Sequence, residues 1–295
     1  MGKPLTSTRR KLAIATWAAP REGNIYGKLT VDAGPALAFL DKVRAQTGEK
    51  VTITHLVGRA VALALAQAPT LNGRIVWGTY RPFDTVDVAF LVALDEGKDL
   101  AKAKVERADH KTTAEIARDL RERAERLRAG KDRDFEKSKG LVRLLPSWML
   151  RRVLAFIGWL TAAVGLGFKS AGLERFPFGS CIVTSVGMFG LDEAFVPPTP
   201  FARVPLYVLV GAVRDRAVVK HGQVVAQPQL TVTATIDHRF IDGFQGGVLA
   251  RIIREVLEDP ERFDTITPAA APAATPTAAL APAAAPAPPA TAPAA

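Results

Sequence analysis

The chain has 295 residues, of which 48% are hydrophobic and 23% charged, so it can bury a sizeable core as one large domain or two. Its net charge of +10 suits an anionic partner, but the basic residues are scattered and accompany no nucleic-acid-binding motif, so we expect no nucleic-acid partner. The single cysteine, Cys181, excludes an internal disulfide, and we read the polar, basic start Met1–Lys11 as no signal peptide, so we expect a cytoplasmic protein.

Apolar periodicity and alternation predict the elements of the first half. They are a short helix over Pro4–Ala18, a strand over Tyr26–Val31, a helix from Gly34, a helix over His55–Ala68, a strand over Thr85–Leu94 and a charged-faced helix over Thr112–Leu127. Thr54 is the expected N-cap of the helix over His55–Ala68, and His55 is expected to have a local capping or surface role.

The segment 140–177 is unusually apolar and carries arginines at its flank. Its uncharged run Val153–Phe168 is shorter than the ~20 residues of a membrane-spanning helix. Three interpretations are open. The segment packs on the body of the domain or on a neighbouring subunit, or Leu141–Phe168 lies in a membrane interface with its basic residues towards phosphates, or it inserts into the membrane.

The second half reads mainly as strands. They are Cys181–Val186, which ends in a Gly-Met-Phe-Gly turn, Leu206–Val213, a Val218–Val225 hairpin that turns at His221-Gly222, and a strand through Thr231–Ile236 before a helix over Val248–Leu257. Thr267–Ala295 is almost only Ala, Pro and Thr, a composition typical of disorder. We therefore expect one domain over residues 1–266, with the insert 140–177, and a disordered tail over 267–295.

The central strand leads into Asp237-His238-Arg239-Phe240-Ile241-Asp242-Gly243, and the other distinctive stretch is Val-Thr-Ser-Val-Gly-Met-Phe-Gly at 183–190. Both resemble the catalytic domain of the dihydrolipoyl acyltransferases of 2-oxoacid dehydrogenase complexes, whose fold chloramphenicol acetyltransferase shares. The resemblance spans roughly Pro4–Arg262, interrupted by 140–177, where the family has a short loop.

This resemblance implies an α/β fold, an α+β sandwich in which helices flank a mixed β-sheet, as in chloramphenicol acetyltransferase. It also implies a homotrimer, which in many members is stacked into a cubic or icosahedral cage. The active site would lie between subunits, with coenzyme A and a dihydrolipoamide arm entering a channel from opposite ends.

Histidine suits a general base because its ordinary pKa lies near working pH, so His238 is expected to deprotonate the thiol of CoA. The resemblance assigns the oxyanion donor to the hydroxyl of Thr184, where the family has Ser, with Ser185 as the next candidate. Asp242 would hold the His238 loop, through a basic residue such as an arginine. Asp237 and Arg239 would brace the same turn, and Gly243 would let the backbone reverse.

The expected function is a CoA-dependent acyltransferase with CoA as substrate and no lipoyl group of its own, so a lipoyl-bearing protein would be a partner. Four scattered histidines and one cysteine give no metal-ligand spacing, and Cys181 lies in an apolar strand without a base partner. The alternative is a catalytically silent structural protein, in which His238 is an ordinary strand-end histidine and the trimer builds a cage or a lipid-associated scaffold.

Overall fold

A mixed seven-stranded sheet organises the molecule, in the order β1-β9-β7-β6-β4-β5 with β8 paired to β9. The structure, a computed structural model, describes residues 23–94, 99–128, 145–168 and 172–266. The pairs β4–β6 and β6–β7 are parallel and the other pairs of this sheet antiparallel. The expected helix Pro4–Ala18 and the tail Thr267–Ala295 lie outside the described residues.

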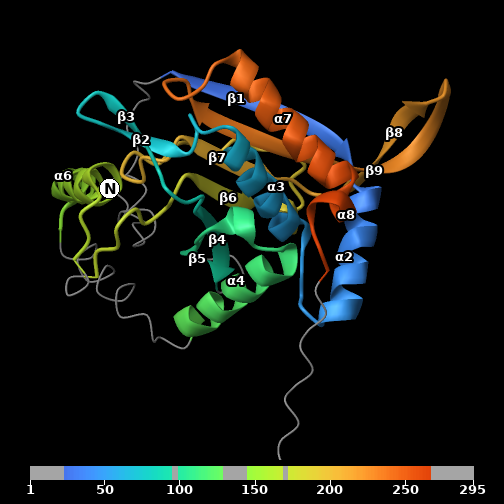
Figure 1. Ribbon diagram of the computed structural model, residues 1–295, viewed down its shortest axis with the longest axis horizontal. Coiled ribbons are helices and arrows are strands. Elements are labelled where there is room, and N and C mark those ends of the chain that lie inside the picture. Colours follow the sequence, from blue (N-terminus) through green and yellow to red (C-terminus); the bar gives the residue numbers. More distant parts are fainter. Residues whose placement is uncertain (1–22, 95–98, 129–144, 169–171, 267–295) are drawn as a thin grey trace, which may run out of the picture.

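In chain order, the described elements begin with the edge strand β1 and end with the helices α7 and α8 (Figure 1). The strands are β1 (Asn24–Asp32), β2 (Gly73–Val76), β3 (Thr79–Pro82), β4 (Val88–Leu94), β5 (Asp99–Val105), β6 (Cys181–Ser185), β7 (Leu206–Val210), β8 (Arg214–Lys220) and β9 (Gln223–Asp237). The α-helices are α2 (Gly34–Thr47), α3 (Ile53–Gln67), α4 (Thr113–Arg128), α6 (Ser147–Gly158), α7 (Gly243–Glu258) and α8 (Pro260–Phe263). Short 3-10 turns cover Ala108–His110 and Gly187–Phe189, and a π-helical turn over Trp159–Val164 continues α6.

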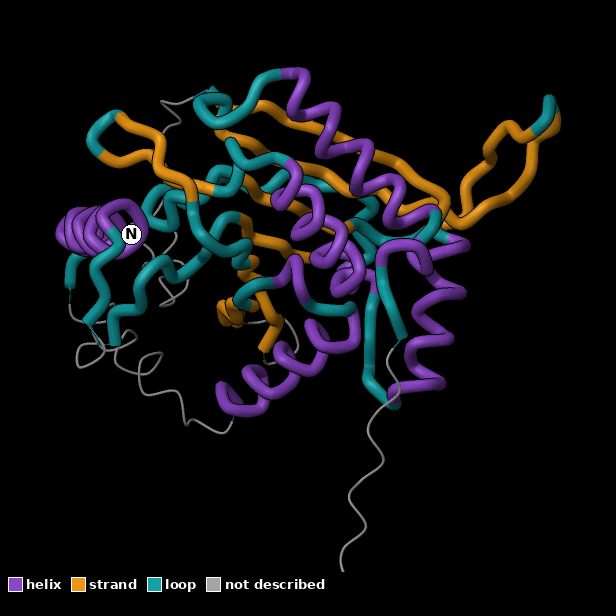
Figure 2. Tube along the Cα trace, viewed as in Figure 1, coloured by secondary structure: helices purple, strands orange, loops and turns teal. Residues whose placement is uncertain are grey.

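The main core lies between the sheet and the helices α3, α4 and α7, which cover one of its faces (Figure 2). Gly58 of α3 lets the helix approach the sheet, because a Cβ there would lie 2.3 Å from the ring of Phe90. A smaller cluster that includes Ile182 and Tyr207 lies on the opposite face. The expected mixed sheet flanked by helices is therefore confirmed.

Most sequence-predicted elements are present with shifted ends. The cap of α3 is Thr52 and not Thr54, because Thr52 has the extended backbone of an N-cap and its amide donates to Nδ1 of His55 at 3.1 Å. The predicted local capping role of His55 is thereby confirmed. Helix α7 begins five residues before the predicted Val248, at Gly243, because Asp242 caps it. The sequence did not predict β5 or the β2–β3 hairpin.

The insert packs on the body of the domain through one side of α6 and its π-helical extension. A Cβ on Gly158 would lie 2.3 Å from the carbonyl oxygen of Phe201, so the helix meets the backbone of that loop directly. Nε of Arg74, in β2, donates to the carbonyl of Ala163 at 2.8 Å, while the amide of Phe176 donates to the carbonyl of Thr161 at 3.2 Å within the insert itself. The described part of the insert is thus anchored at several points.

Candidate active site

His238 lies in a tight turn directly after β9, and its side chain is exposed. Its amide donates to the carbonyl of Gly23 at 3.1 Å, and Nδ1 lies 2.7 Å from the carbonyl oxygen of Ile241. A carbonyl can only accept, so Nδ1 carries the proton and the neutral ring has its lone pair on Nε2. The turn therefore fixes the tautomer that a general base needs.

Asp237 and Arg239 clamp the two sides of this turn. The carboxylate of Asp237 accepts from the amide and from Nε of Arg239, both at 3.0 Å, and from a terminal guanidinium nitrogen at 2.5 Å. The amide of Phe240 closes the turn on the carbonyl of Asp237 at 3.1 Å. Asp237 and Arg239 thus have the bracing geometry that the sequence led us to expect.

Asp242 is exposed at the N-cap of α7 rather than buried against an arginine. Its carboxylate accepts from the amides of Phe244 at 2.9 Å and Gln245 at 3.2 Å, and the Gln245 side chain accepts from the Asp242 amide at 2.8 Å. This reciprocal capping box fixes the helix start, and with it the carbonyl of Ile241 that orients His238. Asp242 acts on the loop as expected, but through backbone amides.

Gly243 does not have the role that the sequence suggested. It is the first residue of α7, its φ lies outside the left-handed region, and nothing lies within 4 Å of a Cβ built there. The reversal is achieved instead by the turn that Asp237 closes.

Thr184 and Ser185 project from opposite faces of β6, since successive strand residues alternate. Val183 belongs to the core under the helices, so Thr184 faces the other side of the sheet, and it is half-buried there. Among the described residues we find no hydrogen-bond partner for the Thr184 hydroxyl. The Ser185 hydroxyl, in contrast, accepts from the amide of Gly187 at 3.3 Å. Of the two, Thr184 is the hydroxyl available to a ligand.

Within one chain, Thr184 and His238 are far apart. Thr184 pairs with Leu209 of β7, which pairs with Thr233 of β9, four residues before Asp237. A strand advances about 3.3 Å per residue and neighbouring strands are about 4.8 Å apart, so the Cα atoms of Thr184 and Asp237 are about 16 Å apart. One chain therefore does not bring the imidazole and the hydroxyl together.

The turn after Thr184 exposes two large apolar side chains. Met188 is 62% exposed and Phe189 is 55% exposed, four and five residues after Thr184. Cys181, three residues before Thr184, is fully buried, and burial raises the pKa of its thiol far above the ordinary value. A thiolate nucleophile at Cys181 is thus disfavoured, as the sequence led us to expect.

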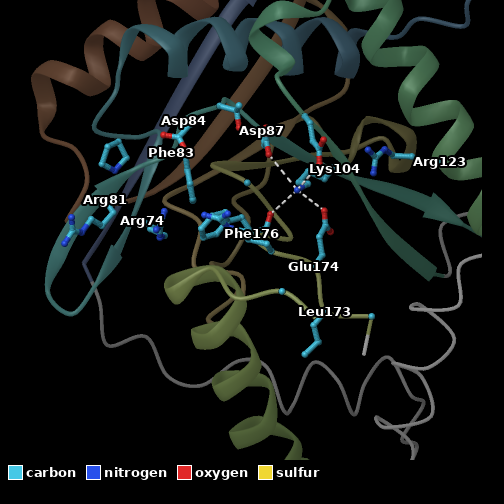
Figure 3. Close-up of a pocket in the computed structure, with 17 residues that line it drawn as sticks. Arg74, Arg81, Phe83, Asp84, Asp87, Lys104, Arg123, Leu173, Glu174 and Phe176 are labelled. Atoms are coloured by element: carbon cyan, nitrogen blue, oxygen red, sulfur yellow. Dashed lines mark hydrogen bonds and ion pairs between the residues drawn. The ribbon is translucent and has the colours of Figure 1, made fainter. Parts of the chain in front are cut away.

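A pocket of the described residues lies elsewhere, between the insert, the β2–β3 hairpin and the start of β4 (Figure 3). Its volume is about 1130 Å³, and Nζ of Lys104 lies inside it, 2.8 Å from Glu174 and 3.7 Å from Asp87. Burial alone would lower the pKa of Lys104, but the hydrogen bond and charge of Glu174 raise it above its usual value. No local sequence pattern indicates this ion-pair cluster, because its members come from distant segments.

No cluster of potential metal ligands occurs in the described parts of the chain. The expectation of a metal-independent site therefore stays a prediction.

Comparison with known proteins shows the family. The model described as "2-oxoacid dehydrogenases acyltransferase (catalytic domain)" matches residues 3–141 and 169–264, and leaves 142–168 of the insert unmatched. A probable dihydrolipoyllysine-residue succinyltransferase component of the mitochondrial 2-oxoglutarate dehydrogenase complex from Schizosaccharomyces pombe is 24% identical over 232 residues, which are 76% of this chain and 41% of that protein. The chain spans between 39% and 47% of the length of the curated relatives it matches.

Two solved structures show the same fold. The cubic core of the pyruvate dehydrogenase multienzyme complex superposes with a TM-score of 0.64 at 16% identity, over 89% of this chain and 94% of that one. Dihydrolipoamide acetyltransferase from Azotobacter vinelandii superposes with a TM-score of 0.60 at 16% identity, over 82% and 84% of the two chains. The latter was studied for the catalytic role of a serine, a histidine and an asparagine four residues after the histidine. Since the family model matches most of its length, this chain belongs to the family of 2-oxoacid dehydrogenase acyltransferase catalytic domains.

Proposed function

We propose that the protein transfers acyl groups between coenzyme A and a second thiol, with His238 as general base. The observation that carries this proposal is the bond from Nδ1–H of His238 to the carbonyl of Ile241, which leaves the Nε2 lone pair on an exposed ring. Nε2 takes the proton of the incoming thiol, and the thiolate attacks the thioester carbonyl carbon. The tetrahedral intermediate collapses with loss of the donor thiolate, which takes the proton back from Nε2.

The oxyanion of that intermediate needs a donor, for which we propose the hydroxyl of Thr184 from a second copy of the chain. The separation of about 16 Å between Asp237 and Thr184 excludes a shared site within one protomer. The exposed side chains of Met188 and Phe189, four and five residues after Thr184, fit a contact surface between copies. The homotrimer is our proposal for the assembly, with stacking into a cage as its extension.

The order of residue types also supports these roles. In the Azotobacter vinelandii enzyme the three residues studied are a serine, a histidine and an asparagine four positions later. This chain has Thr184, His238 and, four positions later, Asp242. A threonine keeps the hydroxyl, and Asp242 keeps a side-chain oxygen that can cap a helix.

For substrates we propose acyl-CoA and a dihydrolipoyl group carried by another chain, in keeping with the names of the curated relatives. The exchange is thioester for thioester, so no redox cofactor takes part.

The test uses two variants that we expect to be nearly inactive alone. His238→Ala and Thr184→Ala are expressed separately and together, and acyl transfer from acetyl-CoA to dihydrolipoamide is measured. If each site takes its histidine and its hydroxyl from different copies, random mixing restores about a quarter of the sites, and activity reappears in the co-expressed sample. Activity of His238→Ala alone would refute the general base. Two inactive variants that fail to complement would refute the shared site, and a wild type without transfer activity would favour the silent scaffold.

A further inference from the structure

One exposed surface of the insert gathers aromatic side chains. We define the aromatic surface as Trp77, Trp148, Arg151, Arg152, Phe156 and Trp159. Trp77 is 78% exposed, Trp148 is 63% and Phe156 is 60%. On α6 and its extension, residues 148, 152, 156 and 159 are spaced as neighbours along one helix face. Three of the four tryptophans of the chain are in this surface.

Most members of the aromatic surface contact a neighbour within it. The guanidinium of Arg152 lies 5.6 Å from the ring centre of Trp148, and the rings of Phe156 and Trp159 are 6.1 Å apart. Trp159 in turn meets Trp77, from the tip of the β2–β3 hairpin, edge to face at 5.5 Å. Two segments far apart in the sequence thus contribute aromatic side chains to the same surface.

This surface cannot fold inward, because the other side of the helix is already packed. Gly158 meets the backbone of Phe201, and Arg74 holds the carbonyl of Ala163. Glu174, just after the insert helix, is tied to Lys104 at 2.8 Å (Figure 3). These contacts hold the aromatic surface pointing outward.

The charge of the surface is of one sign. Residues 142–173 contain no Asp or Glu, and neither does the hairpin 73–82. Arg151 and Arg152 are both exposed on the helix. Tryptophan prefers the boundary between hydrocarbon and water, and arginine binds phosphate oxygens through a planar fork of donors. The combination is complementary to a surface with an apolar interior and anionic groups at its boundary with water.

We propose that the aromatic surface binds bilayers that contain anionic phospholipids, with α6 lying in the plane of the headgroups. Within the described residues, the helix Ser147–Val164 is long enough and apolar enough, by length and composition alone, to cross a membrane. Its 18 residues are about 27 Å long, short of a hydrocarbon core of about 30 Å, and one side is packed on the domain. A helix attached in this way lies on the membrane rather than across it.

The experiment measures binding of the full chain to phosphatidylcholine vesicles, with and without an equal part of phosphatidylglycerol, by flotation. We expect the wild type to float with the anionic vesicles. The variant with Trp148→Ser and Phe156→Ser should lose about tenfold in partition, and Arg152→Glu should lose the preference for phosphatidylglycerol. Tryptophan emission should shift to the blue on binding.

The matched control changes two valines that are as exposed but distant. The control variant carries Val219→Ser and Val224→Ser. Val219 is 72% exposed and Val224 is 73% exposed, and both lie near the tip of the β8–β9 hairpin. This hairpin projects from the side of the molecule opposite α6 (Figure 1). This control should float like the wild type, as should His238→Ala, which separates lipid binding from catalysis. A wild type that does not float, or equal loss in the control, overturns the proposal. If the wild type does not bind vesicles and the variant with Trp148→Ser and Phe156→Ser sediments as a smaller species than the wild type, this surface is a contact between copies instead.

Discussion

Nδ1 of His238 lies 2.7 Å from the carbonyl oxygen of Ile241, three residues later in the same turn. This one contact sets the tautomer, and it depends on a helix cap, since Asp242 fixes the backbone that follows Ile241. The chemistry of the imidazole is therefore coupled to the start of α7.

Replacing His238 should remove activity without unfolding the protein. We expect His238→Ala and His238→Gln to lower kcat by about 10²–10⁴-fold, because both remove the base, while the melting temperature changes little since the side chain is exposed. Steady-state kinetics and thermal melts check this. Binding of CoA by the variants, followed by calorimetry, should persist. A variant that retains wild-type kcat would contradict the role.

Thr184 and Ser185 provide an internal comparison. Thr184→Ala should lower kcat by about 10²–10³-fold, the usual cost of one oxyanion donor, and Thr184→Ser should restore most of it. Ser185→Ala should have a small effect on kcat, since its hydroxyl accepts from the amide of Gly187 and lies on the other face of β6. The reverse order of the two alanine variants would exchange the roles.

Asp242 and Gly243 separate capping from backbone freedom. Asp242→Ala should destabilise the fold by about 1 kcal/mol, because the amides of Phe244 and Gln245 lose their acceptor. Asp242→Asn should keep most of the wild-type stability, because asparagine can still cap the helix. Gly243→Ala should stabilise by about 0.5–1 kcal/mol, because the position is helical and open. Urea denaturation measures both. Destabilisation by Gly243→Ala would show that the reversal needs a glycine after all.

His55 makes stability depend on pH. Burial lowers the pKa of His55 to about 4 from an ordinary 6.5. Between these values the unfolded chain binds a proton that the folded chain does not, so stability is present above pH 6.5 and is lost as the pH falls towards 4. The loss is at most about 3 kcal/mol, and less because the half-buried ring is partly screened by solvent.

Urea midpoints at pH 7 and pH 5 check this expectation. His55→Asn should flatten the difference between them, while His221→Asn, at the exposed tip of the β8–β9 hairpin, should not. If His55→Asn keeps the wild-type difference between the midpoints at pH 7 and pH 5, the His55 ring is not the group responsible for it.

The sequence by itself determined most of the helices and strands, though not β5 or the β2–β3 hairpin, and it determined which residues could carry the chemistry. Alternation in Tyr26–Val31 and the apolar periodicity of His55–Ala68 are local signals, and β1 and α3 follow them within two residues at each end. The strand predicted through Thr231–Ile236 is the C-terminal part of β9, which begins earlier, at Gln223. The Asp-His-Arg turn could be predicted for the same reason, since its side-chain bonds join residues two or three apart, although the His238 amide also bonds the distant carbonyl of Gly23. Caps were harder, because Thr52 and Thr54 are the same residue type, and only the backbone angles of the folded chain select Thr52.

Only the tertiary structure decided the distances between segments. The separation of Thr184 from His238 follows from the pairing register of three strands, which no local pattern encodes. The same holds for Trp77, which joins the insert through a hairpin that the sequence left unassigned, and for Lys104 and Glu174, which pair across 70 residues of chain. Packing between segments, rather than propensity within them, places these side chains, and therefore they became visible only in the folded chain.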